Sequence, residues 1–86
     1  MYLDKPNRFE LFDLMVSRTK VNVHVTEYGS NADHTPTFPL LSGLIQSIGV
    51  EDGSGYNFIV EFQSEEQGLV KLFVATSGNT RVVLLK

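Results

Sequence analysis

The sequence predicts a mainly β protein in which a short N-terminal helix is followed by a five-stranded, strongly bent antiparallel small barrel. Three observations support this fold class. One stretch near the N-terminus has helical periodicity, five later segments have the pattern of strands, and the longest of these segments contains glycines. Consecutive bent strands favour a barrel because closure removes exposed sheet edges. An open, helix-capped sheet is the main alternative. Residues 1–86 form one domain.

Residues 8–17 are predicted to form the helix. Asn7 is followed three residues later by Glu10, which is the spacing of a capping box. A helix this short is not stable alone in water and has to pack on an apolar surface. The apolar residues that we expect it to bury are Phe9, Leu11, Phe12, Leu14, Met15 and Val16.

The remaining chain carries the five strand patterns. The first alternates apolar and polar residues with a period of two, as in a strand with one buried face. Glycines at positions 43 and 49 of the second predict a bend or a bulge there. Residues 29–37 read as a long polar loop of unassigned role. The predicted strands are residues 20–26, 38–50, 56–62, 69–76 and 80–85.

Composition limits the classes of function. The net charge of −3 opposes broad attachment to phosphate backbones, so any nucleic-acid binding has to be local. The absence of cysteine excludes disulfides, thiolate zinc sites and a cysteine nucleophile. No apolar run approaches the ~20 residues of a membrane span, which predicts a cytoplasmic protein without a membrane partner.

Two stretches resemble the paired motifs of the Sm-like family, which includes the Lsm and Hfq proteins. The first, LSGLIQSIGVEDGSGYNFIVEF, has a strand glycine (Gly43), an acidic turn (Asp52) and an asparagine followed by apolar residues (Asn57). The second, SGNTRVVLL, is similar to a Gly-Asn turn that leads into a β-branched strand, here Gly78 and Asn79. The resemblance extends over about residues 8–85 and also covers the order of helix and strands.

The resemblance implies a non-catalytic homo-oligomer that binds RNA or a small nucleotide. The resemblance also implies that the subunits form a ring, in which the fourth strand of one subunit pairs with the fifth strand of its neighbour. The matched nucleotide-binding positions are Asn57, Gly78 and Asn79, and Tyr56 adjoins the first of these positions, where it could stack on a base. Where the family has a stacking arginine this chain has Ser77, and Arg81 lies four residues on.

Other interpretations of the same residues stay open. The Ser-Gly-Asn turn also fits an ordinary hairpin. The aromatic residues Tyr56, Phe58 and Phe62 are favoured as core, with Tyr56 at the strand end as the expected exception. The alternative function is a protein-binding inhibitor or adaptor whose acidic surface meets a basic partner. In that case the loop 29–37 and the turn 64–67 would carry recognition.

We expect no catalytic residues, no metal site and no cofactor. His24, Asp33 and His34 are the only set with acid-base or metal-binding chemistry. They lack a second pair of ligands at close spacing, such as the two histidines one helical turn apart in zincins. A polar strand residue and a loop histidine are the favoured interpretation.

Overall fold

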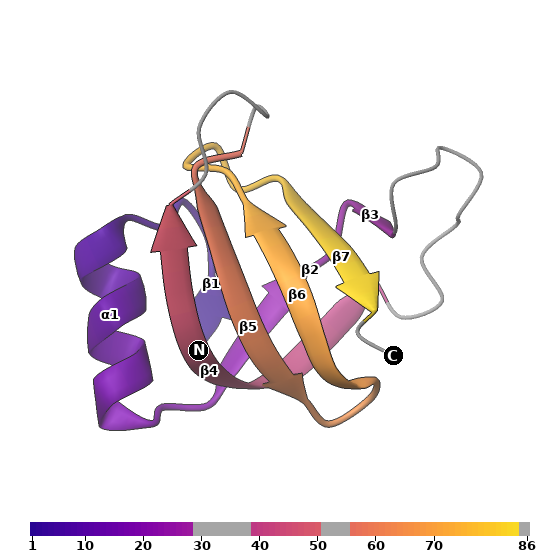
Figure 1. Ribbon diagram of the computed structural model, residues 1–86, viewed down its shortest axis with the longest axis horizontal. Helices are drawn as coiled ribbons and strands as arrows, with labels where there is room; N and C mark the ends of the chain where they lie inside the picture. The colour runs from indigo at the N-terminus through magenta and orange to yellow at the C-terminus, as the bar shows by residue number, and fades with distance from the viewer. Residues whose placement is uncertain (29–38, 51–55, 85–86) are drawn as a thin grey trace.

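The computed structural model describes residues 1–28, 39–50 and 56–84, which form one helix and one curled sheet (Figure 1). This confirms the predicted fold class of a mainly β chain with a short N-terminal helix. In chain order the elements are β1 (Tyr2–Leu3), α1 (Arg8–Ser17), β2 (Val21–His24), β3 (Glu27–Tyr28), β4 (Leu40–Val50), β5 (Phe58–Ser64), β6 (Gly68–Val74) and β7 (Thr80–Leu84).

The sheet has the strand order β1-β2-β4-β5-β6-β7-β3. The five predicted strands are present as β2, β4, β5, β6 and β7, and each pairs antiparallel with the next. The prediction missed β1 and β3, which pair in parallel with β2 and β7. These two strands have two residues each, so they are too short to show a period in the sequence.

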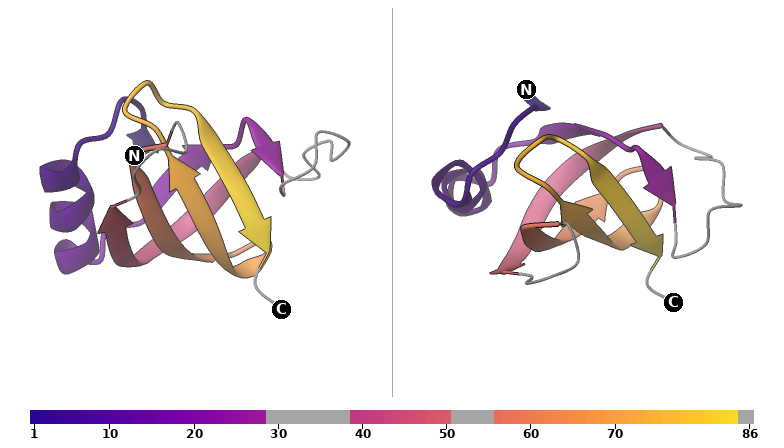
Figure 2. Two further views of the ribbon diagram at one scale, coloured as in Figure 1. Left: turned by 45° about the horizontal axis from the view of Figure 1, so that its top comes forward. Right: turned by 90° about the horizontal axis from the view of Figure 1, so that it is seen from above.

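A pair of threonines brings the two ends of the sheet together. The backbone N–H of Thr26 donates to the carbonyl oxygen of Thr80 at 2.8 Å, and its hydroxyl donates to the same oxygen at 2.7 Å. The hydroxyl also accepts from the N–H of Thr80 at 3.0 Å. Since β2 leads directly into this contact and β3 pairs with β7, the sheet curls back on itself (Figure 2).

The bend in β4 centres on Gly43. This residue pairs with Val21 of β2 on one side and with Ser64 of β5 on the other. A Cβ atom at position 43 would lie 2.8 Å from the carbonyl carbon of Gln63 and 2.9 Å from the Cα of Ser64, so no side chain fits. A register shift between Ile45 and Ser47 bends the strand further, between the two glycines at which the sequence predicts a bend or a bulge.

The boundaries of α1 match the prediction. The side-chain oxygen of Asn7 accepts a hydrogen bond from the N–H of Glu10 at 2.9 Å, which caps the first turn. Arg18 ends the helix in the left-handed conformation with φ of 53°. Its N–H bonds back to the carbonyls of Leu14 and Met15, which satisfies the last turn.

The predicted burial of the helix is wrong for three of its six apolar residues. Leu11 and Leu14 are buried and Met15 packs against the core, whereas Phe9, Phe12 and Val16 are exposed. The helix lies beside β4 at one side of the curled sheet, so only one of its two apolar faces meets the core (Figure 1).

The core fills the inside of the curled sheet and is closed by the inner face of α1. Phe58, Val60 and Phe62 alternate inward along β5, which confirms the favoured interpretation of these aromatics as core; Tyr56 is half-buried. The core residues are Leu3, Leu11, Leu14, Val21, Val23, Val25, Leu41, Ile45, Phe58, Val60, Phe62, Val70, Leu72, Val74 and Val82.

Replacement of Gly43 by alanine is predicted to destabilise the protein. The new methyl group collides with the backbone of β5, which lowers the free energy of unfolding by at least ~2 kcal/mol. Gly49→Ala is the matched control, because its Cβ meets only a carbonyl oxygen at 3.7 Å, and we expect a change within about 0.5 kcal/mol. Urea denaturation measures both. Equal midpoints for the two variants would contradict the role of Gly43.

A second prediction concerns the threonine pair. Thr26→Val keeps the shape of the side chain but removes both hydroxyl hydrogen bonds to Thr80, and we expect it to lower the free energy of unfolding by about 1–2 kcal/mol. Thr26→Ser keeps the hydroxyl and should retain most of this stability. Thermal denaturation followed by circular dichroism compares them. The hydroxyl has no stabilising role if Thr26→Val melts at the temperature of the parent protein.

Candidate functional site

The turn between β6 and β7 has a shape that requires glycine. The N–H of Ala75 donates to the carbonyl of Asn79, and the N–H of Gly78 donates to the carbonyl of Ala75, both at 2.9 Å. Gly78 has φ of +102°, a conformation that residues with a side chain rarely adopt. Its role in the turn is therefore conformational, as the hairpin interpretation predicts.

Asn57 holds this turn in place from the neighbouring strand. Its N–H donates to the carbonyl of Val74 and its side-chain oxygen accepts from the N–H of Thr76, both at 2.9 Å. Asn57, Gly78 and Asn79 therefore lie at one end of the sheet. The oxygen of Asn57 is used within the chain, whereas Asn79 is exposed to solvent.

A cation and two aromatic rings meet beside the turn. The guanidinium carbon of Arg81 lies 5.2 Å from the ring centroid of Tyr56. The ring of Tyr56 in turn contacts the ring of Phe73 at 6.3 Å between centroids, with an angle of 66° between the planes. We call Tyr56, Phe73 and Arg81 the Tyr56 cluster. All three side chains are half-buried.

Strand register explains how the Tyr56 cluster forms. Phe73 of β6 pairs with Ile59 of β5 and with Arg81 of β7, so Phe73 and Arg81 share one face of the sheet. Tyr56, two residues before β5, joins them through its ring contacts. The sequence prediction missed Phe73 because it lies in a strand with apolar residues at nearly every position. Arg81 brings a planar cation next to Tyr56, although the motif position itself holds Ser77.

Charges on this outer face are mixed. Lys71 pairs with Glu61 across β6 and β5, one row along the sheet from Phe73. Glu61 also accepts a hydrogen bond from the hydroxyl of Ser47 at 2.9 Å. The face therefore carries two cations, Lys71 and Arg81, in an otherwise acidic protein.

The acidic turn between β5 and β6 is tied to its own chain. Glu65 forms an ion pair with Lys20 at 2.6 Å, and this hydrogen bond and charge raise the pKa of Lys20 above its usual value. Glu66 accepts a hydrogen bond from the N–H of Ser42 at 3.0 Å. Because the ion pair is exposed, it adds little stability. It does occupy the carboxylate of Glu65, which the alternative function, a protein-binding module, assigned to a basic partner.

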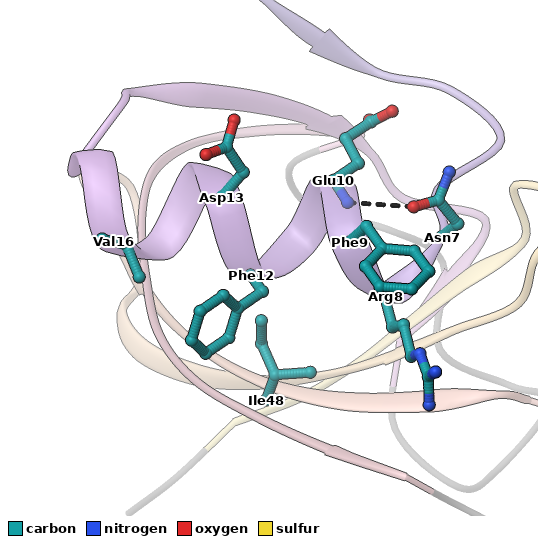
Figure 3. Close-up of a pocket in the computed structure, with 8 residues that line it drawn as sticks. All are labelled: Asn7, Arg8, Phe9, Glu10, Phe12, Asp13, Val16 and Ile48. Carbon is teal, nitrogen blue, oxygen red and sulfur yellow. Dashed lines mark hydrogen bonds between the residues drawn. The ribbon is translucent and has the colours of Figure 1, made fainter.

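An apolar groove runs along the outer side of α1 (Figure 3). Phe9, Phe12 and Val16 line it from the helix, and Ile48 lines it from β4. We call these four residues the α1 face. The guanidinium carbon of Arg8 lies 5.0 Å from the ring centroid of Phe9 at one end of the groove. The residues whose burial was wrongly predicted thus form a surface instead.

Of the candidate metal or acid-base set, only His24 lies in the described part of the chain. His24 stacks on Tyr2 with 5.2 Å between ring centroids and 12° between the planes. Asp33, His34 and the rest of the loop 29–37 lie outside the described residues, as does the turn 51–55 with Asp52. Residues 1–28, 39–50 and 56–84 contain no group of three or more metal-ligating side chains. Within the same ranges, no helix has the length and apolarity to cross a bilayer.

Comparisons with protein families, with curated proteins and with solved structures find no match for this chain.

The strand pairing within the chain bears on the ring that the resemblance to the Sm-like family implies. β6 pairs with β5 and β7, and β7 pairs with β6 and β3. The fourth and fifth of the predicted strands therefore pair with each other within the chain, and each has a partner on both sides.

Asn57 offers a direct test of how the site is built. Asn57→Ala removes the acceptor for the N–H of Thr76, so we expect a loss of about 1 kcal/mol in the free energy of unfolding and faster hydrogen exchange at Thr76. Asn57→Asp retains the acceptor and serves as the control. Unchanged exchange at Thr76 in Asn57→Ala would show that the side chain does not hold the turn.

Proposed function

We propose that this protein is a non-catalytic module that binds RNA or a small nucleotide at the Tyr56 cluster and the adjacent β6–β7 turn. The observation that carries the proposal is the position of Arg81 over the ring of Tyr56, beside the turn that presents Asn79. An aromatic ring, a planar cation and an exposed amide thus gather at one end of the sheet. The absence of cysteine fits a reducing cytoplasm, where we propose that the module acts.

Each of these groups has a role in recognising a nucleotide. Tyr56 and the guanidinium plane of Arg81 provide surfaces on which a base can stack. The charge of Arg81 attracts the phosphate, and the amide of Asn79 offers one acceptor and two donors for the edge of a base. Stacking, charge attraction and hydrogen bonding are non-covalent interactions, so the arrangement supports binding of a nucleotide without catalysis.

The net charge of −3 shapes the expected binding. Only a few cations, among them Lys71 and Arg81, can contact phosphates, so few counterions are released and the dependence on salt is shallow. Stacking, worth about 1–3 kcal/mol per base, then supplies most of the affinity. The proposal therefore favours short single strands or mononucleotides over duplexes.

Binding of labelled U-rich and A-rich oligonucleotides at about 50 mM salt, followed by fluorescence anisotropy, tests the function. Tyr56→Ala removes the stacking ring, and we expect it to raise the Kd about tenfold or more. Asn79→Ala should weaken binding by a smaller factor through the lost hydrogen bonds. Arg81→Lys keeps the charge but loses the plane, so it should bind more weakly than the parent protein.

Arg18→Gln is the matched control, since it removes one arginine charge from the exposed end of α1, away from the Tyr56 cluster. We expect it to bind as the parent protein does. Absence of binding by the parent protein to either oligonucleotide and to mononucleotides would overturn the proposed function. So would a loss in Arg18→Gln as large as the loss in Arg81→Lys, because binding would then not depend on the groups of the Tyr56 cluster.

The second candidate function, a protein-binding module, is favoured by one separate observation. The α1 face exposes two phenylalanines, and large exposed apolar side chains that cluster together mark surfaces for protein contact. This surface lies on α1 and β4, whereas the Tyr56 cluster lies on the outer side of the sheet near β7. The two functions are therefore compatible in one molecule.

A further inference from the structure

The three helical residues of the α1 face are large apolar side chains that lie mostly in solvent. The exposed fractions are 72% for Phe9, 59% for Phe12 and 62% for Val16. Their spacing of three and four residues places them in one row along the helix. Ile48 lies next to Phe12 on the floor of the groove (Figure 3).

The size of this surface fits the centre of an interface between two proteins. Phe9 and Phe12 together expose on the order of 250 Å². Val16 raises the exposed apolar area to somewhat less than half of the ~800 Å² that one partner buries in a standard interface. The polar side chains around the row, Asn7, Arg8 and Asp13, would supply the rim.

The apolar row of Phe9, Phe12 and Val16 has similar side chains on both sides of its middle residue, so it can pair with an identical row. A two-fold interface brings the same patch of both subunits together, so the patch has to be complementary to itself. Phe12 lies near the middle of the row, with Phe9 three residues before it and Val16 four residues after it. Two antiparallel α1 helices crossing at Phe12 would place each Phe12 against its copy and each Phe9 against the Val16 of the other helix.

The charges along α1 fit the same arrangement. Arg8 is the first residue of the helix, where its positive charge opposes the positive end of the helix dipole. The last turn of α1 contains no basic residue of its own, and Arg18 follows it only as the C-cap. In an antiparallel pair each Arg8 would lie beside the C-terminal end of the partner helix, where the helix dipole favours a cation and the charge of the exposed Arg18 opposes part of that gain.

We propose that a second copy of this chain covers the α1 face, so that the protein is a two-fold symmetric dimer whose axis passes beside Phe12. The dimer buries the apolar row of both helices and leaves β6 and β7 paired within each chain. It needs no exchange of strands between subunits. This interface is separate from the Tyr56 cluster, and it assigns the α1 face, offered above as a surface for protein contact, to a second copy of the chain.

Sedimentation equilibrium of the parent protein from about 1 to about 200 µM tests the dimer. We expect the mass to rise with concentration from 9.6 kDa towards twice that value. Phe12→Glu places two carboxylates together at the axis and should raise the dimer Kd at least tenfold. Leu69→Glu is the matched control, because Leu69 is also exposed but lies on β6, and it should associate as the parent protein does.

A cysteine cross-link reports the same contact without destabilising it. The chain has no cysteine, so Phe12→Cys introduces a single thiol at the proposed axis. We expect a short bifunctional thiol reagent to yield a covalent dimer at least tenfold faster in Phe12→Cys than in Leu69→Cys. A parent protein that is monomeric at all concentrations overturns the proposal. An oligomer that forms equally well in Phe12→Glu, or equal cross-linking through positions 12 and 69, overturns it too.

Discussion

The close approach of β4 and β5 at Gly43 is the constraint on which the rest of this structure depends. Strand β4 pairs with β2 up to this residue and with β5 from this residue onward, and that change of partner folds the sheet around its own core. The carbonyl of Gln63 and the Cα of Ser64 occupy the space of a side chain at position 43. The curvature that encloses Phe62 and Leu72 thus rests on the absence of a single methyl group.

Local sequence signals predicted the elements well because they act over short distances. The Asn7–Glu10 spacing located the start of the helix, and alternation located the strands. The inward face of α1 was not predictable in this way, since both of its sides carry apolar residues and only tertiary packing selects between them. Likewise β1 and β3, with two residues each, exist only because longer strands present their edges to them.

In the candidate site too, contacts between strands could not be predicted from short segments of the sequence. The resemblance to the paired motifs implied that Asn57 lies near the β6–β7 turn, and in the structure the side chain of Asn57 accepts a hydrogen bond from Thr76 of that turn. The contact between Arg81 and Tyr56 depends instead on the register of three strands, which no single segment of the sequence encodes. The chain has Ser77 where the motif has an arginine, and Arg81 of β7 lies over the ring of Tyr56 instead.

The pairing of Thr26 with Thr80 has a consequence for how the chain folds. These residues are 54 positions apart, so their hydrogen bonds close the longest loop of the sheet and have a high entropic cost until the strands between them are formed. The hairpins of β4, β5 and β6 are local and can assemble first. During synthesis on the ribosome the early strand that holds Thr26 must wait for almost the entire sheet to emerge. Until then, the interior of the nascent domain stays open along one seam.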